Sequence, residues 1–197
     1  MVPVAARGPY ARGMAKREEI LNVALDVFSK KGYDRTSVRE IARAVNLSQT
    51  GLLHHFTSKE ELFVEVLRMR DDRARDVSVA ANEQSMSVER LIETVRHNES
   101  EPGLVRLYAV MSAESTTPGN PSHDYFVERY ELLRDEFAAS VRSHQADGDL
   151  PTNIDADAIA ALLIAAADGL QVQWLLDPSR DMGVTLEYLW RVILRTR

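Results

Sequence analysis

Residues 35–59 read RTSVREIARAVNLSQTGLLHHFTSK, and this stretch decides the fold. Ser37 and Ser48 each precede a short run of apolar residues at helical spacing, and a serine in that position caps the start of a helix. Asn46, one of the few residues apart from glycine that tolerate a positive φ, lies where the chain must turn between the two runs. Two short helices joined by such a turn predict a helix-turn-helix.

The second helix of such a unit enters the DNA major groove by its N-terminal residues, and the first helix crosses the backbone. We therefore expect Gln49 to pair with adenine, Thr50 to contact a base or a thymine methyl group, and Gly51 to permit close approach. Side chains at the helix starts, two histidines and a lysine are expected to hold phosphates, with Arg39 in reach of phosphate or guanine. The predicted DNA-binding residues are Thr36, Ser37, Arg39, Ser48, Gln49, Thr50, Gly51, His54, His55 and Lys59.

Outward from this stretch the sequence predicts helices throughout, about nine in all, and no alternating strand pattern. The expected fold is all-α: an N-terminal three-helix domain joined by a long helix to a helical ligand-binding and dimerisation domain. The expected divisions are a disordered basic arm at 1–13, the helix-turn-helix domain at 14–60, and the effector-binding and dimerisation domain at 61–197. Met14 offers a second candidate start.

Composition and charge limit the class of protein. The chain has 197 residues, 45% of them hydrophobic and none of them Cys, which is typical of a soluble globular protein and excludes disulfide scaffolds and thiolate metal sites. The net charge of −6 divides into +4 over residues 1–60 and −10 over 61–197, which favours a DNA-facing head on an acidic body. The longest uninterrupted apolar stretch, 158–167, is shorter than a membrane span, and residues 1–15 lack the apolar segment of a signal peptide. We expect a cytoplasmic protein without membrane contact.

Residues 17–67 resemble the N-terminal domain of the tetracycline-repressor (TetR) family of bacterial transcriptional regulators. The resemblance rests on Phe28 to Gly32 with Tyr33, Thr36 to Ala42, Leu47-Ser48, Phe56, and Lys59 with Leu62, and on a weaker signature from Asp168 to Pro178. It implies a homodimer that binds a palindromic operator in double-stranded DNA and is released by a small molecule. The family often has Tyr at the position of Leu53, where it touches the phosphate backbone, and Gly at the position of Asn46. Leu53 is therefore a DNA-binding candidate by resemblance. Because it is not Tyr, we expect the phosphate contact to be made by His54 and His55 beside it.

Two sets of residues in the body are candidates for assembly and for effector binding. The helix predicted at 156–176 is apolar nearly all round, and with the last helix it predicts a seam between two copies. The predicted seam residues are Leu162, Leu163, Ala166, Leu170, Leu186, Leu189, Trp190 and Ile193. A small, largely apolar effector is expected against Tyr108, Met111, Glu114, Phe126, Tyr130, Phe137, Asp168, Gln171 and Trp174. Ordinary core packing is the alternative for each aromatic among them.

The sequence shows none of the common catalytic or phosphate-binding motifs, so we expect no enzyme, no metal and no cofactor. The adjacent histidines point about 100° apart on a helix and make a poor metal pair. The function indicated is a DNA-binding regulator, with a repressor favoured. An activator, a regulator that answers to a protein, and a helical small-molecule carrier or enzyme without DNA binding remain alternatives.

Overall fold

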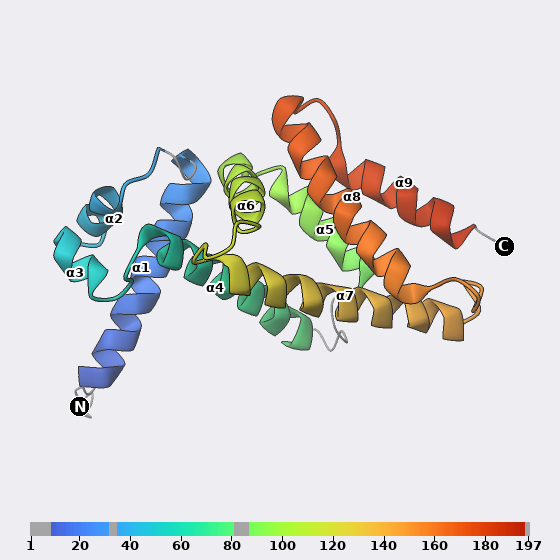
Figure 1. Cartoon of the computed structure of the whole chain (residues 1–197), viewed down its shortest axis with the longest axis horizontal. Coiled ribbons are helices and arrows are strands. Elements are labelled where there is room, and N and C mark those ends of the chain that lie inside the picture. Colours follow the sequence, from blue (N-terminus) through green and yellow to red (C-terminus); the bar gives the residue numbers. More distant parts are fainter. Residues whose placement is uncertain (1–8, 32–34, 81–86, 196–197) are drawn as a thin grey trace, which may run out of the picture.

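The computed structural model describes residues 9–31, 35–80 and 87–195, and folds them into nine α-helices (Figure 1). No strand occurs in these residues, which confirms the predicted all-α class. The helices are α1 (Pro9–Lys31), α2 (Val38–Ala44), α3 (Gln49–Leu53), α4 (Lys59–Ala80), α5 (Val88–Asn98), α6 (Pro102–Glu114), α7 (His123–Ala146), α8 (Ala156–Leu176) and α9 (Met182–Leu194). Helices α1 to α3 form a head at one end of the molecule, and α5 to α9 form the body (Figure 1).

The first helix is longer than predicted. It begins at Pro9, so residues 9–13 are helical and the prediction of a disordered arm is wrong for them. Proline suits a first helical turn because its fixed φ matches the helix and its missing N–H has no partner there. Residues 1–8 of the predicted arm lie outside the described residues.

The two short helices of the head start where the sequence predicts. The Ser37 hydroxyl accepts a hydrogen bond from the Glu40 backbone N–H at 3.2 Å, and the Ser48 hydroxyl accepts one from Gly51 at 3.0 Å. Each bond satisfies an N–H that the first turn of a helix leaves unpaired. Asn46 has a φ of 55° in the turn between them. The structure confirms the predicted helix-turn-helix.

Head and body share one hydrophobic core. Phe28 of α1 belongs to the same buried cluster as Leu107 of α6 and Phe126 of α7. Helix α6 packs directly on α1, and a Cβ at Gly103, in the first turn of α6, would lie 1.9 Å from the Ser29 carbonyl oxygen. The two domains that the sequence analysis divides between residues 60 and 61 are therefore packed together through a common core.

Helix α8 crosses the body in contact with α6, α7 and α9 (Figure 1). By length and composition alone it is able to cross a membrane, with a mean hydropathy of 1.6 over its most apolar window. That window is only 33% buried. The core helix of a soluble bundle also meets this criterion of length and composition, so it does not identify a membrane span. The low burial does show that α8 leaves much of its apolar surface uncovered by the rest of the chain.

Candidate nucleic-acid interface and buried cavity

The start of α3 lies at the surface of the head, at the end of the molecule opposite α9 (Figure 1). Gln49 and Thr50 are exposed, whereas Leu52 and Phe56, which follow them, are 0% and 1% exposed. The apolar residues therefore fix the helix to the head while its polar N-terminal end faces outward. Its backbone N–H groups and its dipole favour an anion at that end.

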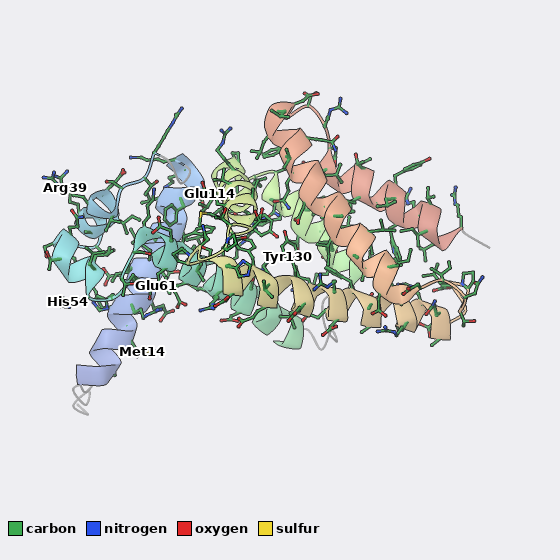
Figure 2. The ribbon with its side chains drawn as sticks, in the orientation of Figure 1. Met14, Arg39, His54, Glu61, Glu114 and Tyr130 are labelled. Atoms are coloured by element: carbon green, nitrogen blue, oxygen red, sulfur yellow. The ribbon has the colours of Figure 1, made fainter. Side chains whose placement is uncertain are left out.

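Most of the predicted DNA-binding residues lie on this outer surface. The exposed ones are Ser37, Arg39, Ser48, Gln49, Thr50, Leu53 and His54, and the half-buried ones are Gly51, His55 and Lys59. Arg39 and His54 are seen at the outer end of the head in Figure 2. Thr36 differs from this group because it is 3% exposed, so its side chain packs inward and offers no surface to a phosphate. The correction follows from its place just before α2, where the chain enters the core.

Two cations of α1 hold the unit in position, and the sequence analysis did not single them out. The Lys16 ammonium donates to the Val45 carbonyl at the end of α2 at 2.7 Å. The Arg17 guanidinium lies 4.5 Å from the centre of the Phe56 ring and 2.8 Å from Glu65 of α4. These contacts join α1 to the end of α2, to the α3–α4 link and to α4, and so fix the position of α3 relative to α1.

A separate cavity of about 100 Å³ lies in the body among α4, α5, α6, α7 and α8. Its apolar wall includes Leu91, Val95, Leu133, Phe137 and Ile164. The polar lining residues are Arg70, Asp71, Thr94, Asn98, Arg129, Asp168 and Gln171. An apolar cavity with a few convergent polar groups is the usual form of a small-molecule site.

The polar side of this cavity is a network of half-buried charged side chains. Asp71 accepts hydrogen bonds from Arg129 and, at 3.1 Å, from the Tyr125 hydroxyl. Asp168 accepts one from the Tyr130 hydroxyl at 2.6 Å. Arg70 donates to the Asn98 side-chain oxygen. The Arg129 side chain is 20% exposed, yet its Nε atom is buried and has no hydrogen-bond partner in the part of the chain that the structure describes.

Burial perturbs the ionisation of this network. It lowers the pKa of Arg129 to about 10, with the positive charge of Arg70 acting in the same direction and Asp168 opposing it. It raises the pKa of Asp168, against the hydrogen bond from Tyr130 and the charge of Arg129. The pKa of Tyr130 rises to about 12 because of burial and its bond to Asp168. Perturbed groups around one cavity mark a candidate binding site.

Two family models match the chain, one over the head and one over the body. The model for bacterial regulatory proteins of the tetR family matches residues 20–66, and the model for the C-terminal part of BetI-type transcriptional repressors matches residues 121–191. The chain belongs to the TetR family. The first match contains the helix-turn-helix described above, so this TetR-family chain is a DNA-binding transcriptional regulator. Its relatives are transcriptional regulators, which are not enzymes.

Known relatives resemble different lengths of this TetR-family chain. The HTH-type transcriptional repressor Rv1474c of Mycobacterium tuberculosis is 31% identical over 51% of this chain, and the match covers only 60% of that relative's own length. The HTH-type transcriptional repressor AcnR of Corynebacterium diphtheriae is 26% identical over 78% of each protein. A transcriptional regulator from Saccharomonospora viridis, solved in complex with choline, has a TM-score of 0.69 and 27% identity, over 87% of this chain and 93% of that one.

The predicted effector residues of this TetR-family chain divide into three groups. Those that line the cavity are Tyr108, Phe137, Asp168 and Gln171. Tyr130 lies behind this lining and donates to Asp168. The others are corrections: Met111, Phe126 and Trp174 are buried in hydrophobic clusters, and Glu114 is exposed at the end of α6 (Figure 2). Phe126 and Trp174 fill the core, as the alternative interpretation for the aromatic residues allowed.

Sequence reasoning missed the two arginines of the cavity, Arg70 and Arg129. A signal was present for Arg129, which lies three residues after Phe126 and four before Leu133 and so shares the apolar face of α7. A charged residue on such a face needs a buried partner or a ligand. Arg70 carries the same signal, because it lies four residues after the buried Val66 and three after the buried Leu67 on the apolar face of α4.

The predicted seam residues are mostly turned inward in this TetR-family chain. Leu163, Leu186, Trp190 and Ile193 are buried within the protomer, with Trp190 donating to Glu89 of α5 at 3.1 Å. Ala166, Leu170 and Leu189 are half-buried, and only Leu162 is exposed, at 58%. The last helix therefore presents a different apolar stripe to solvent. We call the exposed apolar residues of α8 and α9 the outer face: Leu162, Val172, Leu176, Val184, Tyr188 and Val192.

Proposed function

We propose that the chain is a repressor that binds a palindromic operator as a homodimer in the bacterial cytoplasm and leaves it when a small effector occupies the body cavity. The observation that carries the proposal is the outward-facing polar start of α3. Its apolar residues are buried in the head, and its cap bond is complete. A helix presented in this way is suited to enter a major groove.

Base recognition falls to Gln49 and Thr50, the exposed side chains at that end of α3. A bidentate amide–adenine pair is worth about 1–3 kcal/mol of discrimination against the wrong base. The exposed Arg39 and His54, together with Lys59 at the start of α4, are placed to contact phosphates. Such contacts strengthen binding to every sequence and make it depend on salt.

The outer face of α8 and α9 supplies the dimer seam. On α9 its members recur every four residues, and Tyr188 is 70% exposed. On α8 Leu176 is 83% exposed, and a Cβ added at Gly169 would meet no atom within 4 Å. These two exposed apolar stripes lie on helices that pack against each other, and two-fold pairing would bury both stripes on both copies at once.

An effector acts by preferring the shape that cannot bind DNA. Paired heads must hold their recognition helices about 34–36 Å apart to reach successive major grooves, so a small rotation of either head prevents simultaneous contact. Moving the population from 99:1 to 1:99 requires a preference of about 5.5 kcal/mol. Helix α6 lines the cavity with Tyr108 and packs on α1 of the head. A ligand that shifts α6 would therefore change the position of the head.

The experiment is selection of duplexes by the purified chain from a random DNA pool, followed by fluorescence anisotropy on the selected duplex and on a scrambled one. Replacing Gln49 and Thr50 with Ala should reduce the preference between the two duplexes. Lys59→Ala should weaken binding to both and flatten the slope of affinity against salt by about one unit. Lys30→Ala is the matched control, because Lys30 is an exposed lysine of the head that pairs with Asp26, and it should change neither.

A selected consensus without two-fold symmetry would contradict the dimeric part of the proposal. Equal losses on both duplexes after the Gln49 substitution would contradict its base-reading role. Tight small-molecule binding without salt-dependent DNA binding would instead support the carrier alternative.

A further inference from the structure

We infer that Leu53 of α3 reads the operator directly, by packing on the 5-methyl group of one thymine in each half-site. The inference rests on the proposed function, because it requires α3 to enter a major groove. It adds a base contact of a different kind, since Gln49 and Thr50 can form hydrogen bonds with bases and Leu53 cannot.

Leu53 is an apolar side chain on the outward surface of the recognition helix. It is 37% exposed, whereas the adjacent Leu52 is fully buried. In the described part of the head, Met14 is the other exposed large hydrophobic residue, and it lies near the N-terminal end of α1 (Figure 2). Isolated exposed leucines are common on protein surfaces, so the argument depends on the position of Leu53 and not on its exposure alone.

The position of Leu53 is between the two side chains assigned to bases. Successive residues of an α-helix are about 100° apart, so Leu53 lies between Gln49 and Thr50 when α3 is viewed along its axis. All three are exposed, and Leu53 lies about 6 Å further along the axis than Gln49. In homeodomains, residues three, four and seven positions apart on one helix all reach base edges. A base contact one turn beyond Gln49 is therefore within the reach of a recognition helix.

The chemistry of the major groove selects thymine for this contact. Guanine, adenine and cytosine present only hydrogen-bond donors or acceptors there, whereas thymine presents its 5-methyl group beside an acceptor. A leucine placed against a polar edge would remove water from it without replacing the hydrogen bonds. Against the thymine methyl group, apolar surface is buried on both partners. A phosphate offers an apolar side chain no hydrogen bond, so Leu53 cannot replace the tyrosine that the family often has here.

The test replaces single thymines of the selected duplex by deoxyuridine, which removes the methyl group and keeps the hydrogen-bonding groups. Fluorescence anisotropy then measures the affinity of the full chain for each duplex. Burying one methyl group changes an affinity by about fourfold. We therefore expect one thymine position whose replacement in both half-sites weakens binding by about 15-fold.

A variant assigns this methyl contact to Leu53. Leu53→Ala should bind the thymine and deoxyuridine duplexes with equal affinity. Leu132→Ala is the matched control, because Leu132 is 40% exposed on α7, and it should keep the full difference between the two duplexes. Thr50→Ser removes the methyl group of the other candidate for this contact and should keep the difference as well. Circular dichroism shows whether each variant is folded, and the deoxyuridine series on the unmodified chain tests the inference without any variant.

Several results would overturn the inference. They are a selected half-site without thymine, an unmodified chain that is insensitive to every replacement, and a Leu53→Ala variant that still distinguishes the two duplexes. A difference that disappears in Thr50→Ser and persists in Leu53→Ala assigns the contact to Thr50 instead. All of these results leave operator selection intact, whereas a chain that selects no duplex overturns the proposed function and this inference with it.

Discussion

Replacing Gly103 with Ala tests the contact that joins the head to the body. The added Cβ would lie 1.9 Å from the Ser29 carbonyl oxygen and 2.5 Å from that of Phe28. Ordinary van der Waals contact begins at 3.4 Å, so α6 and α1 must separate locally by about 1.5 Å. Both obstructing atoms belong to the backbone of α1, and no side-chain rotation removes them.

The cost of this substitution follows from two opposing effects. Forcing extra volume into a packed core costs about 1–3 kcal/mol, and the upper part of that range, about 2–3 kcal/mol, applies here because both obstructing atoms are backbone. Alanine gains up to about 1 kcal/mol over glycine in a helix, and Gly103 does not have the positive φ that would strain an alanine. The net loss is about 1–2 kcal/mol in the free energy of unfolding. For a chain of this length that lowers Tm by about 2–8 °C.

The assay is thermal unfolding followed by circular dichroism at one protein concentration, since a dimer's Tm depends on it. Gly13→Ala is the matched control, because Gly13 also lies in a helix and a Cβ there meets nothing within 4 Å. It should unfold at the same temperature as the unmodified chain or higher. If Gly103→Ala behaves like this control, then α1 and α6 are not in the close contact from which the shared core was argued.

Two further predictions concern the seam and the cavity. Tyr188→Glu places a charge on the outer face and should convert the proposed dimer to a monomer, as measured by light scattering after gel filtration. Val127→Glu is the control, because Val127 is 43% exposed on α7, and it should leave the dimer intact. If the Tyr188 variant is still a dimer, this face is not the seam. Because burial raises the pKa of Asp168 above 3.8, its charged form destabilises the fold at neutral pH, and this cost disappears as the pH falls through that raised pKa. Asp168→Asn should therefore raise Tm at pH 7, and this gain in Tm should shrink toward pH 4. Asp147→Asn, at an exposed position, is the control and should show no such trend. A gain in Tm that is the same at every pH would contradict the argument.

Local signals in the sequence were enough to place the head. A cap is decided within a few residues, so Ser37, Ser48 and the turn at Asn46 could be read without knowledge of the tertiary fold, and the structure shows all three as expected. The exposed start of α3 does not follow from this short-range pattern, because Gln49 lies three residues before the buried Leu52 and therefore on the same side of the helix.

The seam could not be read in the same way. Helix α9 carries two apolar stripes, one with Leu186 and Trp190 and another with Val184 and Tyr188. The more hydrophobic stripe was predicted to meet a second copy, yet it is the one that fills the protomer core against α5 and α8. Periodicity shows that a helix has apolar faces, but the competition between intramolecular and intermolecular burial depends on where the neighbouring helices lie.

The same dependence on packing makes α6 an element that contacts both the head and the cavity. Its Gly103 is pressed on the α1 backbone, and one turn and a half later Tyr108 lines the cavity, 5.4 Å below the guanidinium of Arg129. A rigid helix cannot shift at Tyr108 without shifting at Gly103, and the close contact there leaves α1 no slack to absorb the movement. A ligand that moves Tyr108 must therefore also displace the head.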